Sequence, residues 1–131
     1  MRIRKPTERW FEVPGDPDGA SIKIKALSPG ERFAIYDKAF KQTITYTDSG
    51  PKVRQDTDTG LDRIETAKAV IVDWKQMYDE KGKLLSCTPG NIVRVVNGID
   101  GFMVFIRDCM KRLDYDLEAE KKDQEKNLPT T

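Results

Sequence analysis

The sequence predicts an α+β fold, in which a small amino-terminal antiparallel sheet of β-hairpins packs against a bundle of about four helices. Three observations carry this prediction: alternation of apolar and polar residues near the amino terminus, capping signals at Ser28 and Thr88, and a carboxyl-terminal apolar stripe with helical spacing. The chain has 131 residues, enough for one domain to bury a core without disulfides or metal. We expect a single α+β domain over residues 1–117.

The first predicted element is a β-hairpin. Residues 9–13 alternate in polarity, and residues 21–26 place Ile22, Ile24 and Ala26 on one face with lysines on the other. Residues 14–19, Pro-Gly-Asp-Pro-Asp-Gly, are rich in turn formers. Two strands joined by this turn would form the hairpin.

A helix is predicted from Pro29 to about Lys41. Ser28 and Glu31 have the spacing of a capping box, in which each side chain bonds the other residue's backbone amide. Phe33, Tyr36 and Phe40 fall on one helical face, which predicts that this aromatic stripe lies in the core.

A second hairpin is predicted next, with strands at 42–47 and 52–55 and a turn at 48–51. The alternating acids of 56–60 resemble a calcium loop, but Gly60 and Ala67 stand where that loop needs oxygen ligands, so we expect no metal there. Asp58 or Thr59 is instead expected to cap a central helix from Gly60 to Trp74.

The remaining chain predicts a turn and two helices. Asp79 to Lys83 has the composition of an exposed turn, Thr88 and Pro89 open a helix that runs to about Asn97, and the last helix begins at Gly101. Its stripe has spacings of three and four: Phe102, Phe105, Ile106, Cys109, Met110, Leu113 and Leu117. Residues 118–131 are charged and are expected to form a disordered tail.

Composition argues against several classes of function. The chain has no histidine, which removes the usual general base and the commonest zinc ligand, and we expect no enzyme, metal or cofactor. The 23 basic and 22 acidic residues nearly cancel, which argues against a nucleic-acid or membrane partner. The amino-terminal basic arm (Arg2, Arg4, Lys5, Arg9) is more simply a solvated terminus than a phosphate-binding segment. Cys87 and Cys109 are expected to be reduced thiols.

Six short motifs occur along the chain in a fixed order. They are Trp10-Phe11-Glu12-Val13, Asp16-Pro17-Asp18-Gly19, Leu27-Ser28-Pro29-Gly30-Glu31, Asp73-Trp74, Asp79-Glu80-Lys81-Gly82-Lys83 and Thr88-Pro89-Gly90-Asn91. In this order the chain resembles the tail assembly chaperones of long-tailed bacteriophages and prophages.

The resemblance implies a non-catalytic protein of the bacterial host cytoplasm. Such chaperones bind the long helical tape measure protein, keep it soluble and release it as tail tube protein assembles around it. We expect contacts from exposed apolar side chains, and the candidates are Phe102, Phe105, Met110, Leu113, Leu117 and, on the second hairpin, Tyr46. Self-association into a homo-oligomer stays open. The alternative is a structural tail or head-tail connector component of the virion, and a third interpretation is a nucleic-acid-binding accessory protein.

Overall fold

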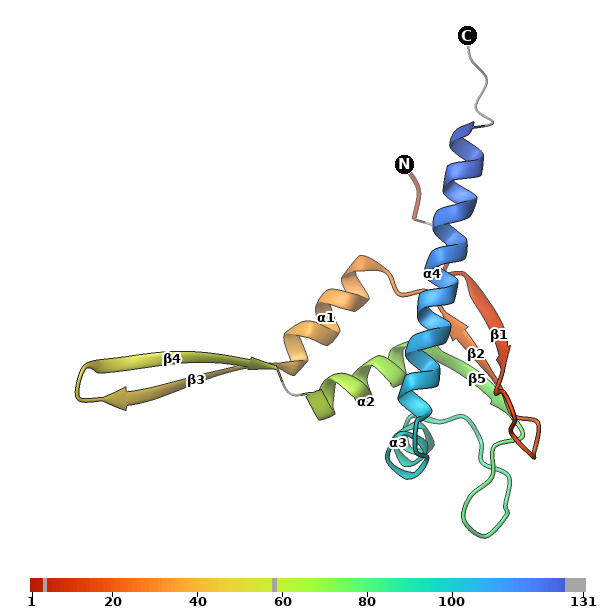
Figure 1. The fold of residues 1–131 in the computed structure, drawn as a ribbon, viewed down its shortest axis with the longest axis horizontal. Coiled ribbons are helices and arrows are strands. Elements are labelled where there is room, and N and C mark those ends of the chain that lie inside the picture. Colours follow the sequence, from red (N-terminus) through yellow and green to blue (C-terminus); the bar gives the residue numbers. More distant parts are fainter. Residues whose placement is uncertain (4, 58, 127–131) are drawn as a thin grey trace.

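The α+β prediction is confirmed: a three-stranded antiparallel sheet, a separate β-hairpin and four helices make up the described chain (Figure 1). The structure, a computed structural model, describes residues 1–3, 5–57 and 59–126, with the backbone alone for 41–46, 52–57, 59, 125 and 126. The elements are β1 (Glu8–Glu12), β2 (Ser21–Lys25), α1 (Pro29–Ala39), β3 (Phe40–Thr47), β4 (Gly50–Thr57), α2 (Thr59–Val70), β5 (Ile71–Lys75), α3 (Pro89–Gly98) and α4 (Phe102–Lys126).

The predicted first hairpin supplies two of the three strands of the sheet. β1 and β2 pair antiparallel, with Phe11 opposite Ile22, and β5 pairs antiparallel with the other edge of β2. The inner face buries Phe11, Ile22 and Ile24 against the helices, and α4 packs against β2. The main hydrophobic core therefore lies between the sheet and helices α2, α3 and α4.

The predicted helix from Gly60 to Trp74 is wrong in its last turn, because α2 ends at Val70 and the chain continues as strand β5. The residues at the switch, Val70, Ile71 and Val72, are β-branched and fit a pleated strand better than a helix. Pairing with β2 places Trp74 opposite Ile22 and buries its side chain. Asp58, one of the two proposed caps of this helix, lies outside the described residues.

The second hairpin is confirmed and is longer than predicted. β3 and β4 pair in regular register from Phe40 opposite Thr57 to Thr47 opposite Gly50, with a turn at Asp48 and Ser49. The hairpin starts where α1 ends and projects away from the sheet and the other helices (Figure 1). In the described part of the chain, it forms a two-stranded sheet of its own.

The capping box of α1 is confirmed, but its aromatic stripe is not part of the core. Ser28 accepts a hydrogen bond from the Glu31 amide, and Glu31 accepts one from the Ser28 amide. The buried side of α1 consists of Ile35 and Ala39, which face α2. The prediction that Phe33 and Tyr36 are core residues is therefore wrong.

The carboxyl-terminal half follows the prediction closely. Thr88 caps α3 by accepting from the Asn91 amide, and Pro89 occupies the first turn. Gly101, with φ of 74°, precedes α4. We expected a disordered tail from residue 118, but α4 continues as a helix past Leu117 to Lys126. Residues 127–131 of the predicted tail lie outside the described part.

Candidate partner-binding surfaces

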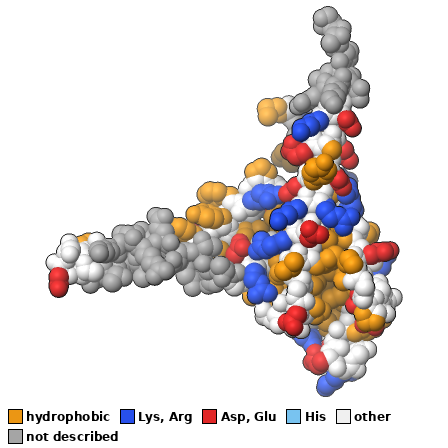
Figure 2. Space-filling model, in the orientation of Figure 1, with side chains coloured by type: hydrophobic (Ala, Val, Ile, Leu, Met, Phe, Trp, Pro, Cys, Tyr) orange, Lys and Arg blue, Asp and Glu red, His pale blue; other side chains and the backbone are white. Residues whose placement is uncertain are grey.

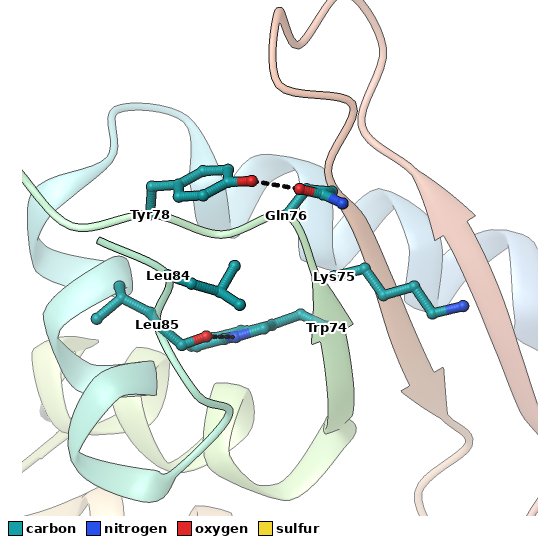
Figure 3. A pocket seen from close by; sticks show the side chains of 6 residues that line it. All are labelled: Trp74, Lys75, Gln76, Tyr78, Leu84 and Leu85. Carbon is teal, nitrogen blue, oxygen red and sulfur yellow. Dashed lines mark hydrogen bonds between the residues drawn. The ribbon is translucent and has the colours of Figure 1, made fainter. Parts of the chain in front are cut away.

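Trp74 anchors the loop that follows β5 (Figure 3). Its indole Nε1 donates a hydrogen bond of 2.8 Å to the carbonyl oxygen of Leu85, and its side chain is only 6% exposed. The chain leaves the strand at Gln76, which has φ of 58°, a left-handed conformation that costs energy for a residue with a Cβ. The hydroxyl of Tyr78 donates to the Gln76 side chain. These contacts fix the loop against the end of the sheet.

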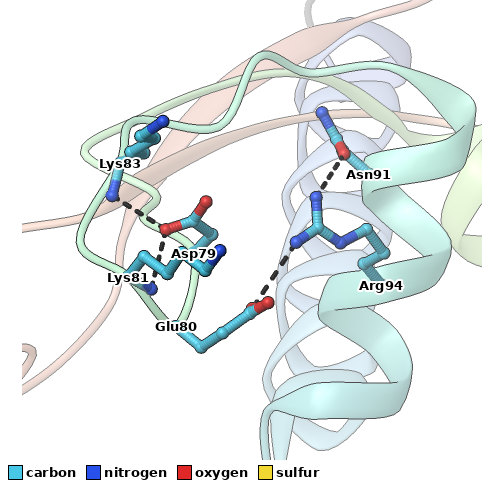
Figure 4. Close-up of polar contacts among 6 residues, drawn as sticks. All are labelled: Asp79, Glu80, Lys81, Lys83, Asn91 and Arg94. Atoms are coloured by element: carbon cyan, nitrogen blue, oxygen red, sulfur yellow. Dashed lines mark hydrogen bonds and ion pairs between the residues drawn. The ribbon is translucent and has the colours of Figure 1, made fainter.

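The acidic turn after Tyr78 is held by Asp79 (Figure 4). One oxygen of its carboxylate, Oδ1, accepts from the backbone amides of Lys81 and Lys83, at 2.9 and 2.8 Å. The turn closes around Gly82, whose φ of 79° suits glycine. An ion pair of 3.5 Å between Glu80 and Arg94 connects the turn to α3. The turn thus joins a strand to a helix, where the sequence suggested a link between two helices.

The motif residues between Asp73 and Asn91 therefore have structural roles. Trp74 connects the strand to the loop, and Asp79 holds the turn. The Asn91 side-chain amide donates a hydrogen bond of 2.9 Å to the carbonyl oxygen of Ser86. Leu84 is the most exposed large apolar side chain of the described loop, at 68%, and it lines a shallow hollow of about 440 Å³. This hollow is small and open, and among the described residues that line it only Lys75 is charged.

Two exposed aromatic side chains lie close together on α1. Phe33 is 71% and Tyr36 is 55% exposed, and the ring of Tyr36 lies 5.7 Å from that of Phe40 at the start of β3. Figure 2 shows hydrophobic side chains gathered over α1 beside the base of the hairpin. We call Phe33, Tyr36 and Phe40 the α1 stripe. The helical spacing identified the stripe, but sequence reasoning assigned it to the core and missed it as a surface.

The α4 candidates divide into buried and half-buried residues. Phe102 and Leu113 lie in the core, with 6% and 1% exposure, whereas Phe105, Met110 and Leu117 pack at the margin of the core and are half-buried. The exposed part of the predicted stripe is therefore confined to these last three residues. Tyr46 lies in β3, and its side chain is outside the described part of the structure.

Leu117 also borders a groove between the amino-terminal segment, the start of α1 and the second half of α4. The groove has a volume of about 740 Å³. Its apolar lining comes from Ile3, Pro6, Ala26, Leu27, Pro29 and Leu117. An ion pair of 3.0 Å between Arg32 and Asp114 lies along it, and Arg9 of the basic arm pairs with Asp116 nearby on α4. The described part of the basic arm is thus partly engaged within the protein.

Neither thiol has the character of a nucleophile. Burial, with a smaller contribution from the Asp73 charge, raises the pKa of Cys87 to about 11, and burial likewise raises the pKa of Cys109 to about 11. Both cysteines are free. Among the described residues, no group of three or more acidic or cysteine side chains is arranged to hold a metal ion. None of the described helices combines the length and apolar character needed to cross a membrane.

Comparison of the chain with protein-family models, with curated proteins and with solved structures finds no match.

Proposed function

We propose that this protein is a non-catalytic tail assembly chaperone of a long-tailed bacteriophage or prophage, acting in the cytoplasm of the bacterial host. Its partner in this proposal is the helical tape measure protein, which it keeps soluble until tail tube protein assembles. The ordered motifs from Trp10 to Asn91 support the family.

The observation that carries the proposal is the exposed α1 stripe. Phe33 and Tyr36 are large aromatic side chains on a regular helix, and a folded protein gains nothing in stability by exposing both. Aromatic side chains on a rigid element are typical anchors for an apolar partner surface. An amphipathic helix of the partner would cover the stripe with its own apolar face.

Co-expression tests the proposal. A tape measure protein encoded beside this gene should stay soluble and co-purify with the wild-type chain, and a Phe33→Ser/Tyr36→Ser variant should lose this activity. The matched control is Val104→Ser/Tyr115→Ser, because both of these α4 side chains are 75% exposed and lie outside the stripe. Equal loss in both variants would show that the stripe has no special role.

The protein composition of mature particles distinguishes the chaperone from the alternative, a structural tail or head-tail connector component. Mass spectrometry of purified virions should find the chaperone absent or at trace level. A stoichiometric amount in mature tails would overturn the chaperone proposal and support the structural one.

A further inference from the structure

The β3–β4 hairpin has two free edges of very different character. Neither strand pairs with a third strand in the described part of the chain. Isolated two-stranded hairpins are at best marginally stable in water, and unprotected edge strands tend to pair with another chain. An arm built from two eight-residue strands therefore raises the question of what completes its sheet.

The hairpin register identifies the backbone groups at each edge. Thr47 lies opposite Gly50 across the turn, and all other pairs follow in step. Because hydrogen-bonded and non-hydrogen-bonded pairs alternate in an antiparallel ladder, the amides and carbonyls of Gln42, Ile44 and Tyr46 point to the free edge of β3. On β4, the same rule assigns Pro51, Val53 and Gln55 to the opposite edge.

Beyond Lys41, the β3 edge lacks the charges and prolines that commonly protect an edge strand. Residues 42–47, Gln-Thr-Ile-Thr-Tyr-Thr, contain no charge and no proline and favour strands. The β4 edge carries Pro51, which has no amide hydrogen to donate, and the basic residues Lys52 and Arg54. Only the β3 edge is therefore open for a further strand.

We propose that a second copy of this chain pairs with that edge, so that β3 and the β3 strand of the second copy run antiparallel about a two-fold axis at Ile44. In this register Gln42 lies opposite Tyr46 and Thr43 opposite Thr45, so the outward backbone groups of Gln42, Ile44 and Tyr46 in each copy are all used. No like charges face each other. The product is a four-stranded sheet, β4-β3-β3-β4, with the protected β4 edges outside.

The same construction fails at the other edge. Antiparallel pairing of two β4 strands about Val53 would place Lys52 opposite Arg54 twice, and like charges directly opposite destabilise a sheet. Pro51 would also leave a carbonyl of the second copy without its donor. The charge pattern and Pro51 thus favour β3 over β4 as the edge at which two copies pair. This inference does not depend on the proposed chaperone activity.

Sedimentation velocity of the full chain over a range of micromolar concentrations tests the dimer. The wild type should sediment as a dimer, and a chain that stays monomeric throughout would overturn the proposal. Thr43→Glu/Thr45→Glu should weaken dimerisation about tenfold, because two pairs of glutamates would face each other across the two-fold axis. Within one chain, the new glutamates lie opposite Arg54 and Lys52, so the hairpin itself keeps its pairing.

A pair of proline variants identifies the edge. Ile44→Pro removes an outward amide of β3 and should give monomers, whereas Val53→Pro removes the equivalent amide of β4 and should leave the dimer intact. A dimer that survives Ile44→Pro overturns the proposal. If both proline variants are monomeric, the double-glutamate variant decides: a dimer at wild-type strength overturns the β3 interface, and a weakened dimer supports it.

Discussion

The indole of Trp74 and the carbonyl oxygen of Leu85 are joined by a hydrogen bond of 2.8 Å that spans most of the segment between β5 and α3. This bond fixes a loop that has no strand or helix of its own beyond a single bridge between Tyr78 and Leu84. It also explains why a tryptophan, with both a large apolar body and one donor, suits the end of this strand.

Trp74→Phe should therefore destabilise the protein by about 1–3 kcal/mol, because it leaves the Leu85 carbonyl without its partner and the space around the ring underfilled. Denaturant unfolding measures the change. Trp10→Phe is the matched control: Trp10 lies on the outer face of the sheet, 37% exposed, with the Lys75 ammonium 4.5 Å above its ring. Trp10→Phe should lower the free energy of unfolding by less than about 1 kcal/mol. A similar loss in both variants would contradict the role assigned to the hydrogen bond between Trp74 and Leu85.

Ile106→Ala should cost about 2–5 kcal/mol, since this side chain is fully buried where α4 covers the sheet and its removal leaves a cavity. Val104→Ala, two residues earlier on the same helix and 75% exposed, should change the unfolding free energy by less than about 0.5 kcal/mol. Equal effects at the two positions would mean that α4 does not pack as described.

Glu31 should make stability depend on acid pH. Its hydrogen bond with Lys25, 2.8 Å from Nζ to Oε2, and its bond from the Ser28 amide lower the pKa of this carboxyl below its ordinary value of 4.5. The folded state thus holds the proton less tightly than the unfolded state. The contribution of the Glu31 carboxylate to the free energy of unfolding is therefore present above its ordinary pKa. It is lost as the pH falls through the lowered pKa of the folded state.

Glu31→Gln should accordingly destabilise the protein at neutral pH and have a smaller effect in acid. Unfolding free energies of the two proteins, measured at several pH values, give this difference directly. Glu120→Gln on the exposed second half of α4 serves as the control. A Glu31→Gln effect that does not change with pH would rule out the carboxylate as its cause.

The two cysteines should react slowly with iodoacetamide. A rise in pKa from 9.0 to about 11 lowers the thiolate fraction at neutral pH roughly a hundredfold. Cys87 is half-buried and Cys109 is buried, so Cys87 should react first, and both should react rapidly once the protein is denatured. Labelling of the native protein at the rate of an unfolded control would contradict the burial of both thiols.

The same shift predicts a loss of stability in alkali. A thiol whose pKa is raised in the folded state favours folding as long as it stays protonated in both states. This contribution is present below the unfolded value near 9 and is lost as pH rises towards about 11. A Cys109→Ala variant should show a shallower decline over that range.

Local signals in the sequence predicted most of the elements. The capping box at Ser28 and the cap at Thr88 place the starts of α1 and α3 correctly, because a cap depends on residues within one turn of the chain. The hairpin turns were equally local. The α4 stripe indicated a helix and a buried face, which Ile106 and Leu113 confirm.

The errors arose where distant residues decide the structure. Ile71 and Trp74 fit the face of a helix as well as a strand, and only pairing with Ser21 to Ile24, some fifty positions earlier, selects the strand. On α1, Ile35 and Ala39 form a second apolar face that competes with Phe33 and Tyr36. Which of the two faces is buried depends on where α2 lies, and the spacing within α1 carries no information about that.

The central position of β2 has a consequence for how the protein folds during synthesis. Its two neighbours are β1, made just before it, and β5, made only after α1, the hairpin and α2 have been translated. The hairpin of β1 and β2 therefore leaves the ribosome before β5 can pair with the β2 edge. Its apolar face also stays uncovered until α4 is made. We expect a nascent chain that stops before residue 102 to need protection from holding chaperones of the host, and the full-length chain to escape it.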